Sequence, residues 1–190
     1  MRRSLLIFSL AALAVVPAQA SAQSQNSSGL WLGLTMGGGW GRIGCDLCVA
    51  GRELGYTGTL SFGGTVRDGL LVGAEVGGWT FQQEEARQTI GSLSGILTMY
   101  PRPDESGLFV RGGLGVNYAK VTEGDQDVDA TTVGVQLGVG HEYHLTRGWS
   151  LLNAVNVMAS SFGSLKAGDE TIVGDVSNTV VRFTIGVKKH

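Results

Sequence analysis

Proline and cysteine are scarce in this sequence, and neither sign of charge is in large excess. The 190 residues include 3 prolines and 2 cysteines, and the formal net charge is −2. This charge excludes the strongly basic surface of a typical nucleic-acid-binding protein. Glycine is abundant, with 31 residues, and hydrophobic residues make up 43% of the chain. Without a G-x-y period the chain is not collagen-like, and it is too hydrophobic for a disordered protein.

Long hydrophobic runs are absent except near the N-terminus. Two arginines precede an apolar run over residues 5–16, and small residues follow it. This pattern is typical of a secretory signal peptide, with cleavage after Ala20 or Ala22. We expect residues 1–22 to be removed and residues 23–28 to form a short linker. The protein is therefore predicted to be exported.

No later segment reads as a membrane-spanning helix. The N-terminal run is itself shorter than the ~20 residues that such a helix needs. Beyond residue 22, glycine, serine or a charged residue interrupts every apolar run. The apolar character of the exported chain needs another explanation.

A period of two residues, typical of β-strands, recurs along the rest of the chain. In 29–40, for example, one face carries Leu30, Leu32, Leu34 and Met36, and the other carries Trp31, Gly33, Thr35 and Gly37. Each such segment is long enough for a tilted membrane-spanning strand, which takes about 9–11 residues. The eight predicted strands are 29–40, 54–66, 70–81, 89–100, 107–121, 131–144, 149–160 and 178–188.

The connections between these segments alternate in length. Short ones at 67–69, 101–106 and 145–148 alternate with longer ones at 41–53, 82–88, 122–130 and 161–177. Outer-membrane barrels have this asymmetry, with short periplasmic turns and longer extracellular loops. The alternative is a soluble β-sandwich, which would bury its aliphatic face and leave a polar face in water.

The face opposite the aliphatic residues is rich in glycine, threonine and serine, which suits the narrow interior of eight strands. Closure also satisfies every backbone group in hydrocarbon. The sequence therefore predicts an all-β protein, an eight-stranded antiparallel up-and-down transmembrane β-barrel over residues 29–190. We expect it to be a monomer in a bacterial outer membrane, with both termini in the periplasm.

Four charged residues fall on the predicted inward face. Two acids and two bases are able to pair across a narrow lumen. We expect a structural ion-pair cluster that fills the barrel, with proton or ion passage as the alternative. Trp31, Trp79 and Phe109 also alternate inward among glycines, as in small barrels that pair bulky and small residues. The charged residues are Glu75, Arg111, Glu142 and Arg182.

Aromatic residues lie near the ends of the predicted strands, where interfacial rings are common in membrane barrels. The same position is also common for aromatic residues in other β proteins. These residues are Trp40, Tyr56, Tyr100, Tyr118, Tyr143 and Trp149.

The chemical motifs of the sequence favour no catalytic or metal site. Cys45 and Cys48 lie in the first long connection without the second ligand pair of a zinc site or the βαβ context of a redox motif. In an exported protein we expect them to form a disulfide. The spacing of Asp125, Asp127 and Asp129 resembles a calcium loop, but the glycine and glutamate such a loop needs later are missing. No cofactor is predicted.

Several glycine-rich strand motifs carry a resemblance to a known family. They include Leu70–Glu75, Tyr100-Pro101, Gly107–Gly115 and Phe183–Val187, together with the two cysteines of the first loop. Over essentially the whole exported chain they resemble the small eight-stranded bacterial outer-membrane β-barrel proteins, which are OmpX-like or OmpA-barrel-like. The resemblance implies an interior polar cluster and insertion by the outer-membrane assembly machinery, which reads an alternating last strand. Many such strands end in phenylalanine, whereas this chain continues to Lys188-Lys189-His190.

The expected function is a structural or surface-interaction role, with a side-chain-filled lumen and four extracellular loops. Outer-membrane lipids are the expected partners, and the sequence does not identify a ligand for the loops. One alternative is a narrow transport path for small or apolar solutes. The other is a lipid-modifying barrel enzyme, for which the sequence shows no nucleophile–base pair.

Overall fold

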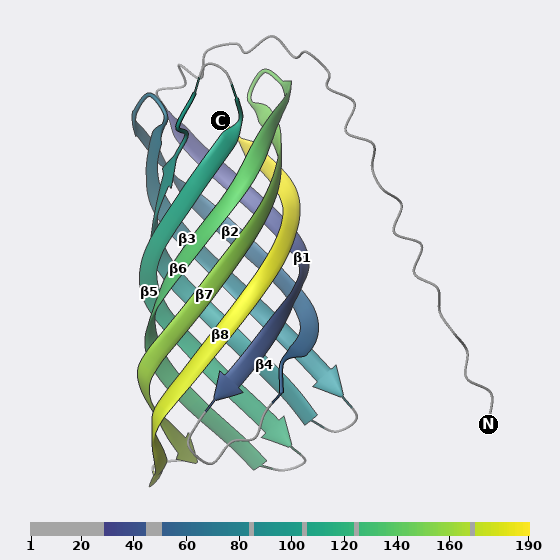
Figure 1. The fold of residues 1–190 in the computed structure, drawn as a ribbon, viewed down its shortest axis with the longest axis vertical. Helices are drawn as coiled ribbons and strands as arrows, with labels where there is room; N and C mark the ends of the chain where they lie inside the picture. Colours follow the sequence, from purple (N-terminus) through teal and green to yellow (C-terminus); the bar gives the residue numbers. More distant parts are fainter. Residues whose placement is uncertain (1–28, 45–50, 84–85, 104–105, 124–125, 168–169) are drawn as a thin grey trace, which may run out of the picture.

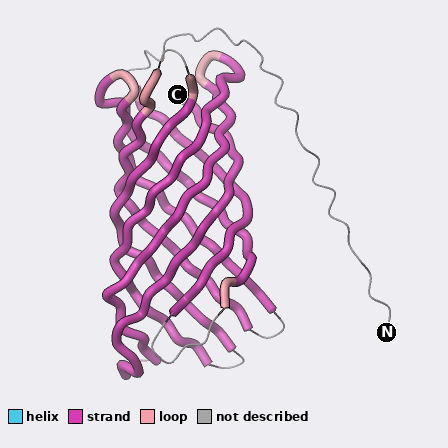
Figure 2. Tube along the Cα trace, in the orientation of Figure 1, coloured by secondary structure: helices cyan, strands magenta, loops and turns pink. Residues whose placement is uncertain are grey.

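The computed structural model describes residues 29–44, 51–83, 86–103, 106–123, 126–167 and 170–190. Within these ranges the chain forms strands and turns, and no helix there is long and apolar enough to cross a membrane. Figures 1 and 2 show long tilted strands around a single axis. The strands are β1 (Leu30–Gly44), β2 (Glu53–Arg67), β3 (Leu70–Gln83), β4 (Ala86–Met99), β5 (Leu108–Glu123), β6 (Gln126–Thr146), β7 (Trp149–Ala167) and β8 (Glu170–Lys189). All eight predicted strands are present.

The sheet closes on itself. Each strand pairs antiparallel with its neighbours in sequence, and β1 also pairs with β8. Leu34, for instance, lies opposite Leu60 on one side and Val187 on the other. Closure leaves no strand edge without a hydrogen-bonding partner, which is the condition for a sheet to span hydrocarbon. The predicted up-and-down barrel is confirmed.

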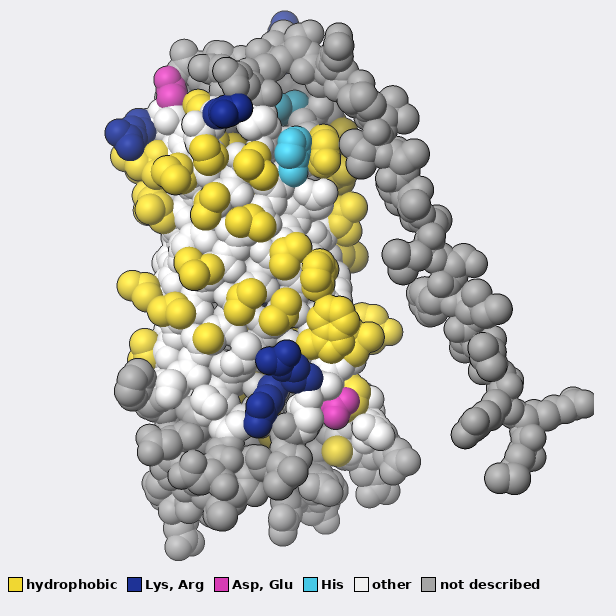
Figure 3. Space-filling model, in the orientation of Figure 1, with side chains coloured by type: hydrophobic (Ala, Val, Ile, Leu, Met, Phe, Trp, Pro, Cys, Tyr) yellow, Lys and Arg dark blue, Asp and Glu magenta, His cyan; other side chains and the backbone are white. Residues whose placement is uncertain are grey.

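Aliphatic side chains cover the outer wall. Four of them, Leu34, Leu60, Val110 and Val135, and the aromatic Phe183 come from five different strands and have between 40% and 52% of their surface exposed. Figure 3 shows hydrophobic side chains spread over the wall, with most of the charged ones towards the two ends. A soluble sandwich would bury these residues, so the arrangement fits a barrel whose outer face contacts lipid.

The two ends of the barrel differ. Tight turns with positive φ at Gly69 (74°) and Gly148 (86°) lie at the end where β1 begins and the chain terminates, the upper end in Figure 1. We call this the turn end and the opposite one the loop end. The turns after β2 and β6 are short, as predicted.

The loop-end connections are shorter than the sequence suggested. Most residues of the predicted connections 82–88, 122–130 and 161–177 continue the strands, as β6 and β7 show most clearly. These residues lie outside the segments of alternating apolar residues from which the strands are predicted. Backbone ladder hydrogen bonds do not require apolar side chains, so a hairpin is able to continue beyond the apolar wall with polar residues on both faces.

Candidate functional site

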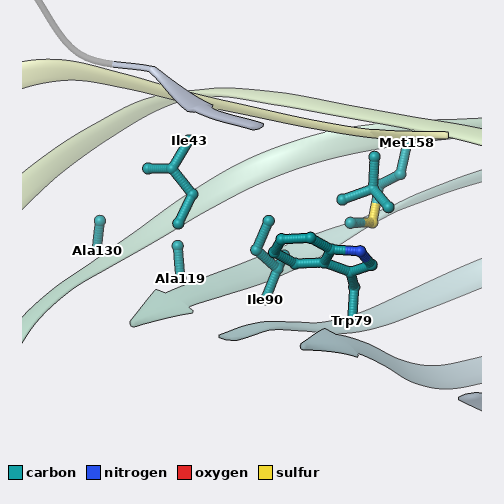
Figure 4. Packing of buried hydrophobic residues seen from close by; sticks show 7 residues of the cluster. Ile43, Trp79, Ile90, Ala119, Ala130 and Met158 are labelled. Carbon is teal, nitrogen blue, oxygen red and sulfur yellow. The ribbon is translucent and has the colours of Figure 1, made fainter. Parts of the chain in front are cut away.

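The lumen is the part of the molecule in which polar, charged and aromatic side chains converge, and hydrophobic side chains fill it at the loop end. Figure 4 shows the Trp79 ring beside Ile90, with Met158 nearby. The Trp79 indole Nε1–H donates a 2.8 Å hydrogen bond to the Gly39 carbonyl. This loop-end cluster consists of Ile43, Trp79, Ile90, Ala119, Ala130, Met158 and Val180.

A second hydrophobic cluster fills the turn end. Tyr100 belongs to this cluster, so its ring lies inside the barrel. The sequence predicts an outer interfacial ring for Tyr100, and this prediction is wrong. Tyr100 follows the last residue of β4, and the other five predicted aromatic residues are exposed. This turn-end cluster consists of Trp31, Leu71, Ile96, Tyr100, Phe109 and Leu152.

Glycines make room for the inward rings. A Cβ atom added at Gly41 or Gly55 would lie 2.7–2.8 Å from the indole of Trp79. One added at Gly140 would lie 2.4 Å from the ring of Phe109. These distances are too short for any side chain, so the bulky rings and the glycines are complementary, as the sequence predicted.

Three of the predicted charged residues meet inside the barrel. Glu75 accepts hydrogen bonds from Arg111 Nη1 at 2.9 Å and from Arg182 Nη2 at 2.6 Å, one at each carboxylate oxygen. Arg182 Nη2 also lies 2.8 Å from Gln136 Oε1, and Arg111 Nε lies 3.1 Å from Thr98 Oγ1. All of these residues are buried. We call Glu75, Arg111 and Arg182 the central ion triad; it brings together β3, β5 and β8.

Glu142 belongs to a separate group at the turn end. Its carboxylate accepts hydrogen bonds from Lys188 Nζ at 3.0 Å and His190 Nε2 at 2.7 Å, and from the Tyr100 hydroxyl. Burial, followed by the neighbouring Glu142, raises the pKa of Tyr100, which keeps this hydroxyl protonated as a donor. The single cluster expected from the sequence is therefore divided into two.

The strand tilt explains this division. Residues on the same face of different strands meet only if they have the same depth in the barrel. Glu142 lies opposite Leu152 near the end of β6, whereas Arg182 lies opposite Asn156, deeper in β7. Lys188 on β8 and His190 just after it share the inward parity of Arg182, so the alternation of side chains is a sequence signal for both.

The described residues contain one serine–histidine contact of interest for catalysis. Ser150 Oγ lies 3.0 Å from His144 Nδ1. The Ser150 side chain is fully buried, so a substrate has no access to its hydroxyl. No group of three or more metal-ligating side chains occurs within the described ranges.

Some predicted features lie outside the described residues. They are the signal peptide 1–22, the linker 23–28, and the cysteines Cys45 and Cys48. The disulfide and the cleavage site therefore stay predictions.

A closed barrel with an aliphatic outer wall and a polar, side-chain-filled interior defines a transmembrane β-barrel protein of the bacterial outer membrane. Residues 8–188 match the outer membrane protein beta-barrel domain family, and the chain belongs to this family. No curated protein matches the sequence.

Two solved structures with the same architecture are similar to this barrel. Neisserial surface protein A is 17% identical, with 85% of this chain and 97% of that chain covered and a TM-score of 0.62. Ail, the attachment invasion locus protein of Yersinia pestis, is 12% identical, with 85% and 99% covered and a TM-score of 0.53. At these identities the likeness shows the shared fold.

Proposed function

We propose that this protein is a structural and surface-interaction barrel with a lumen closed to solutes. The observation that carries the proposal is the filling of the lumen at successive depths. The loop-end cluster, the central ion triad, and the turn-end cluster with Glu142 and its partners each bring side chains from several strands together. The hairpin ends at the loop end, with their connections, are then the part available to outside partners, and their ligand stays unassigned.

The ion pairs support closure because they are expensive to break. An ion that passes the centre has to displace Glu75 from two buried arginines. Separating a buried pair without replacement costs about 3–5 kcal/mol. Opening would therefore need a coordinated rearrangement of side chains from three strands.

We also propose the partners, orientation and oligomeric state of the barrel in the outer membrane. Outer-membrane lipids cover the aliphatic wall, and the assembly machinery inserts the chain. Short turns face the periplasm in this class of barrel, so both termini are periplasmic. A closed sheet has no edge for pairing with another copy, which favours a monomer. We propose a role without a serine nucleophile, because the hydroxyl of Ser150 is enclosed.

A narrow transport path is the second candidate, and one observation favours it. Gln136 Nε2, Asn178 Oδ1 and Arg182 Nε are buried in the lumen without a hydrogen-bonding partner among the described residues. Buried polar atoms of this kind are commonly satisfied by water. A chain of such waters is what a proton or small-ion path requires.

Single-channel recording separates the two candidates. The purified barrel in a planar lipid bilayer is expected to give no discrete current steps, because side chains fill its lumen. A general porin in the same membrane provides the positive control. Reproducible steps that change in size or ion selectivity in Arg182→Leu would establish a path through the lumen and contradict the closed barrel.

A further inference from the structure

The membrane-facing wall carries a pair of polar residues within an aliphatic region. His141 on β6 lies directly opposite Asn153 on β7, and both point outward. The same row continues to Leu108 on one side and to Ile185 on the other. A polar group that faces hydrocarbon without a hydrogen-bonding partner is costly in free energy. A ligand that supplied such a partner would remove this cost.

A groove surrounds this pair. It has a volume of about 500 Å³, within the range of small-molecule sites. His141 and Asn153 are the polar side chains on its outer surface, and Thr184, which also lines it, is buried. The apolar side chains that line it are Met36, Leu108, Val139, Val155, Phe183 and Ile185.

The pair offers hydrogen-bond donors to a ligand. The His141 backbone N–H donates to Asn153 Oδ1 at 3.1 Å, which orients the Asn153 amide. The amide NH₂ of Asn153 then has no acceptor among the described residues. It remains exposed within the groove.

The imidazole of His141 adds another donor. Its ring packs against Tyr143, with the ring centroids 4.2 Å apart. Nδ1 is enclosed and has no hydrogen-bonding partner in the part of the chain that the structure describes. An enclosed N–H without an acceptor is costlier than an unused lone pair, so the hydrogen belongs on Nε2, the more accessible ring nitrogen. The groove therefore presents hydrogen-bond donors from both residues, and a ligand with an acceptor oxygen would satisfy them.

The position of the groove across the membrane indicates which hydrogen-bond acceptor is available. Leu108 begins β5 at the turn end, and His141 lies near the end of β6. The exposed rings of Tyr143 and Trp149 lie closer still to that end, as expected at a membrane interface. Ester and phosphate oxygens of membrane lipids occur at this level, with acyl chains beside the aliphatic wall.

We propose that this groove binds one glycerophospholipid of the leaflet at the turn end. An acyl chain lies along the apolar lining, and ester or phosphate oxygens accept hydrogen bonds from His141 Nε2 and Asn153 Nδ2. The site is independent of whether the lumen is open or closed.

Lipid binding to the full barrel in a maltoside detergent tests the proposal. Native mass spectrometry with phosphatidylethanolamine is expected to show one retained lipid, bound at least tenfold more weakly by the double variant His141→Leu/Asn153→Leu. Thr131→Leu, which removes another exposed polar side chain of β6 outside the groove, is the matched control and is expected to bind as the wild type does. Heat-modifiable gel migration verifies that each variant is closed.

A second measurement needs no variant. In the wild-type barrel, the side-chain ¹⁵N resonances of His141 are expected to shift saturably with short-chain phosphatidylethanolamine and not with glycerophosphoethanolamine, which lacks acyl chains. Unchanged lipid binding in the double variant, or no shift of His141, would overturn the proposal. An equal response to the chain-free compound would show a simple anion site instead. A wild-type dimer that the double variant dissociates would assign the groove to a second copy of the chain.

Discussion

Replacement of Glu75 by alanine is expected to destabilise the folded barrel by about 3–5 kcal/mol. The carboxylate is the shared partner of Arg111 and Arg182, both of which are buried. Among the described residues, its removal leaves the two positive charges without a counter-ion, with Thr98 as the neutral partner of Arg111 and Gln136 as that of Arg182. Urea unfolding in lipid vesicles, followed by tryptophan fluorescence, measures this loss.

Two further variants identify charge as the cause. Ser61 lies directly opposite Glu75 on β2, is buried and is uncharged, so Ser61→Ala is expected to cost no more than about 1 kcal/mol. Replacing the whole central ion triad, as Glu75→Met, Arg111→Met and Arg182→Leu, is expected to recover most of the stability, because no unpaired charge remains. A loss below 1 kcal/mol in Glu75→Ala would show that the triad does not hold the barrel together.

Replacement of Trp79 by alanine is expected to cost about 3–5 kcal/mol, the usual range for a large aromatic residue in a core. Trp79 is almost fully buried in the loop-end cluster. The variant loses the hydrogen bond to Gly39 and leaves a void above Gly41 and Gly55, which have no side chains to fill it. The same unfolding assay measures the effect.

Trp40→Ala is the matched control for this substitution. Trp40 is 44% exposed on the outer wall and makes an edge contact with Phe183 at a centroid distance of 5.8 Å. Since lipid replaces the lost ring, we expect a clearly smaller effect than at Trp79. Equal losses at the two positions would contradict a well-packed interior at the loop end.

The alternation of side chains was sufficient to predict which residues face the lumen. Trp31, Trp79 and Phe109 all lie inside, and the outward aliphatic residues remain exposed. A strand has a fixed period of two, so the face of each residue follows from its parity within the strand. Tyr100 was misassigned because it was grouped with the aromatic residues of strand ends without regard to its parity.

The depth of each residue was not available from the same pattern. The position of each residue within the alternation of its strand shows that it faces inward, but not which inward residues meet. This holds for Glu75, Arg111, Glu142 and Arg182. Which of them meet depends on the register of each pair of strands and on the tilt imposed by closure. The structure accordingly joins Glu142 to Lys188 and His190 near the C-terminus, and joins Glu75 to Arg111 and Arg182.

The amino-acid sequence by itself thus determined eight strands, their order and the side of the wall that each residue occupies, since these follow from local periodicity and from the segments between strands. Tertiary structure alone decided which inward charges pair, where the hairpins end, and that His141 meets Asn153 in a groove on the outer wall. These features join residues of different strands, and their separation is set by closure of the whole sheet rather than by any single strand.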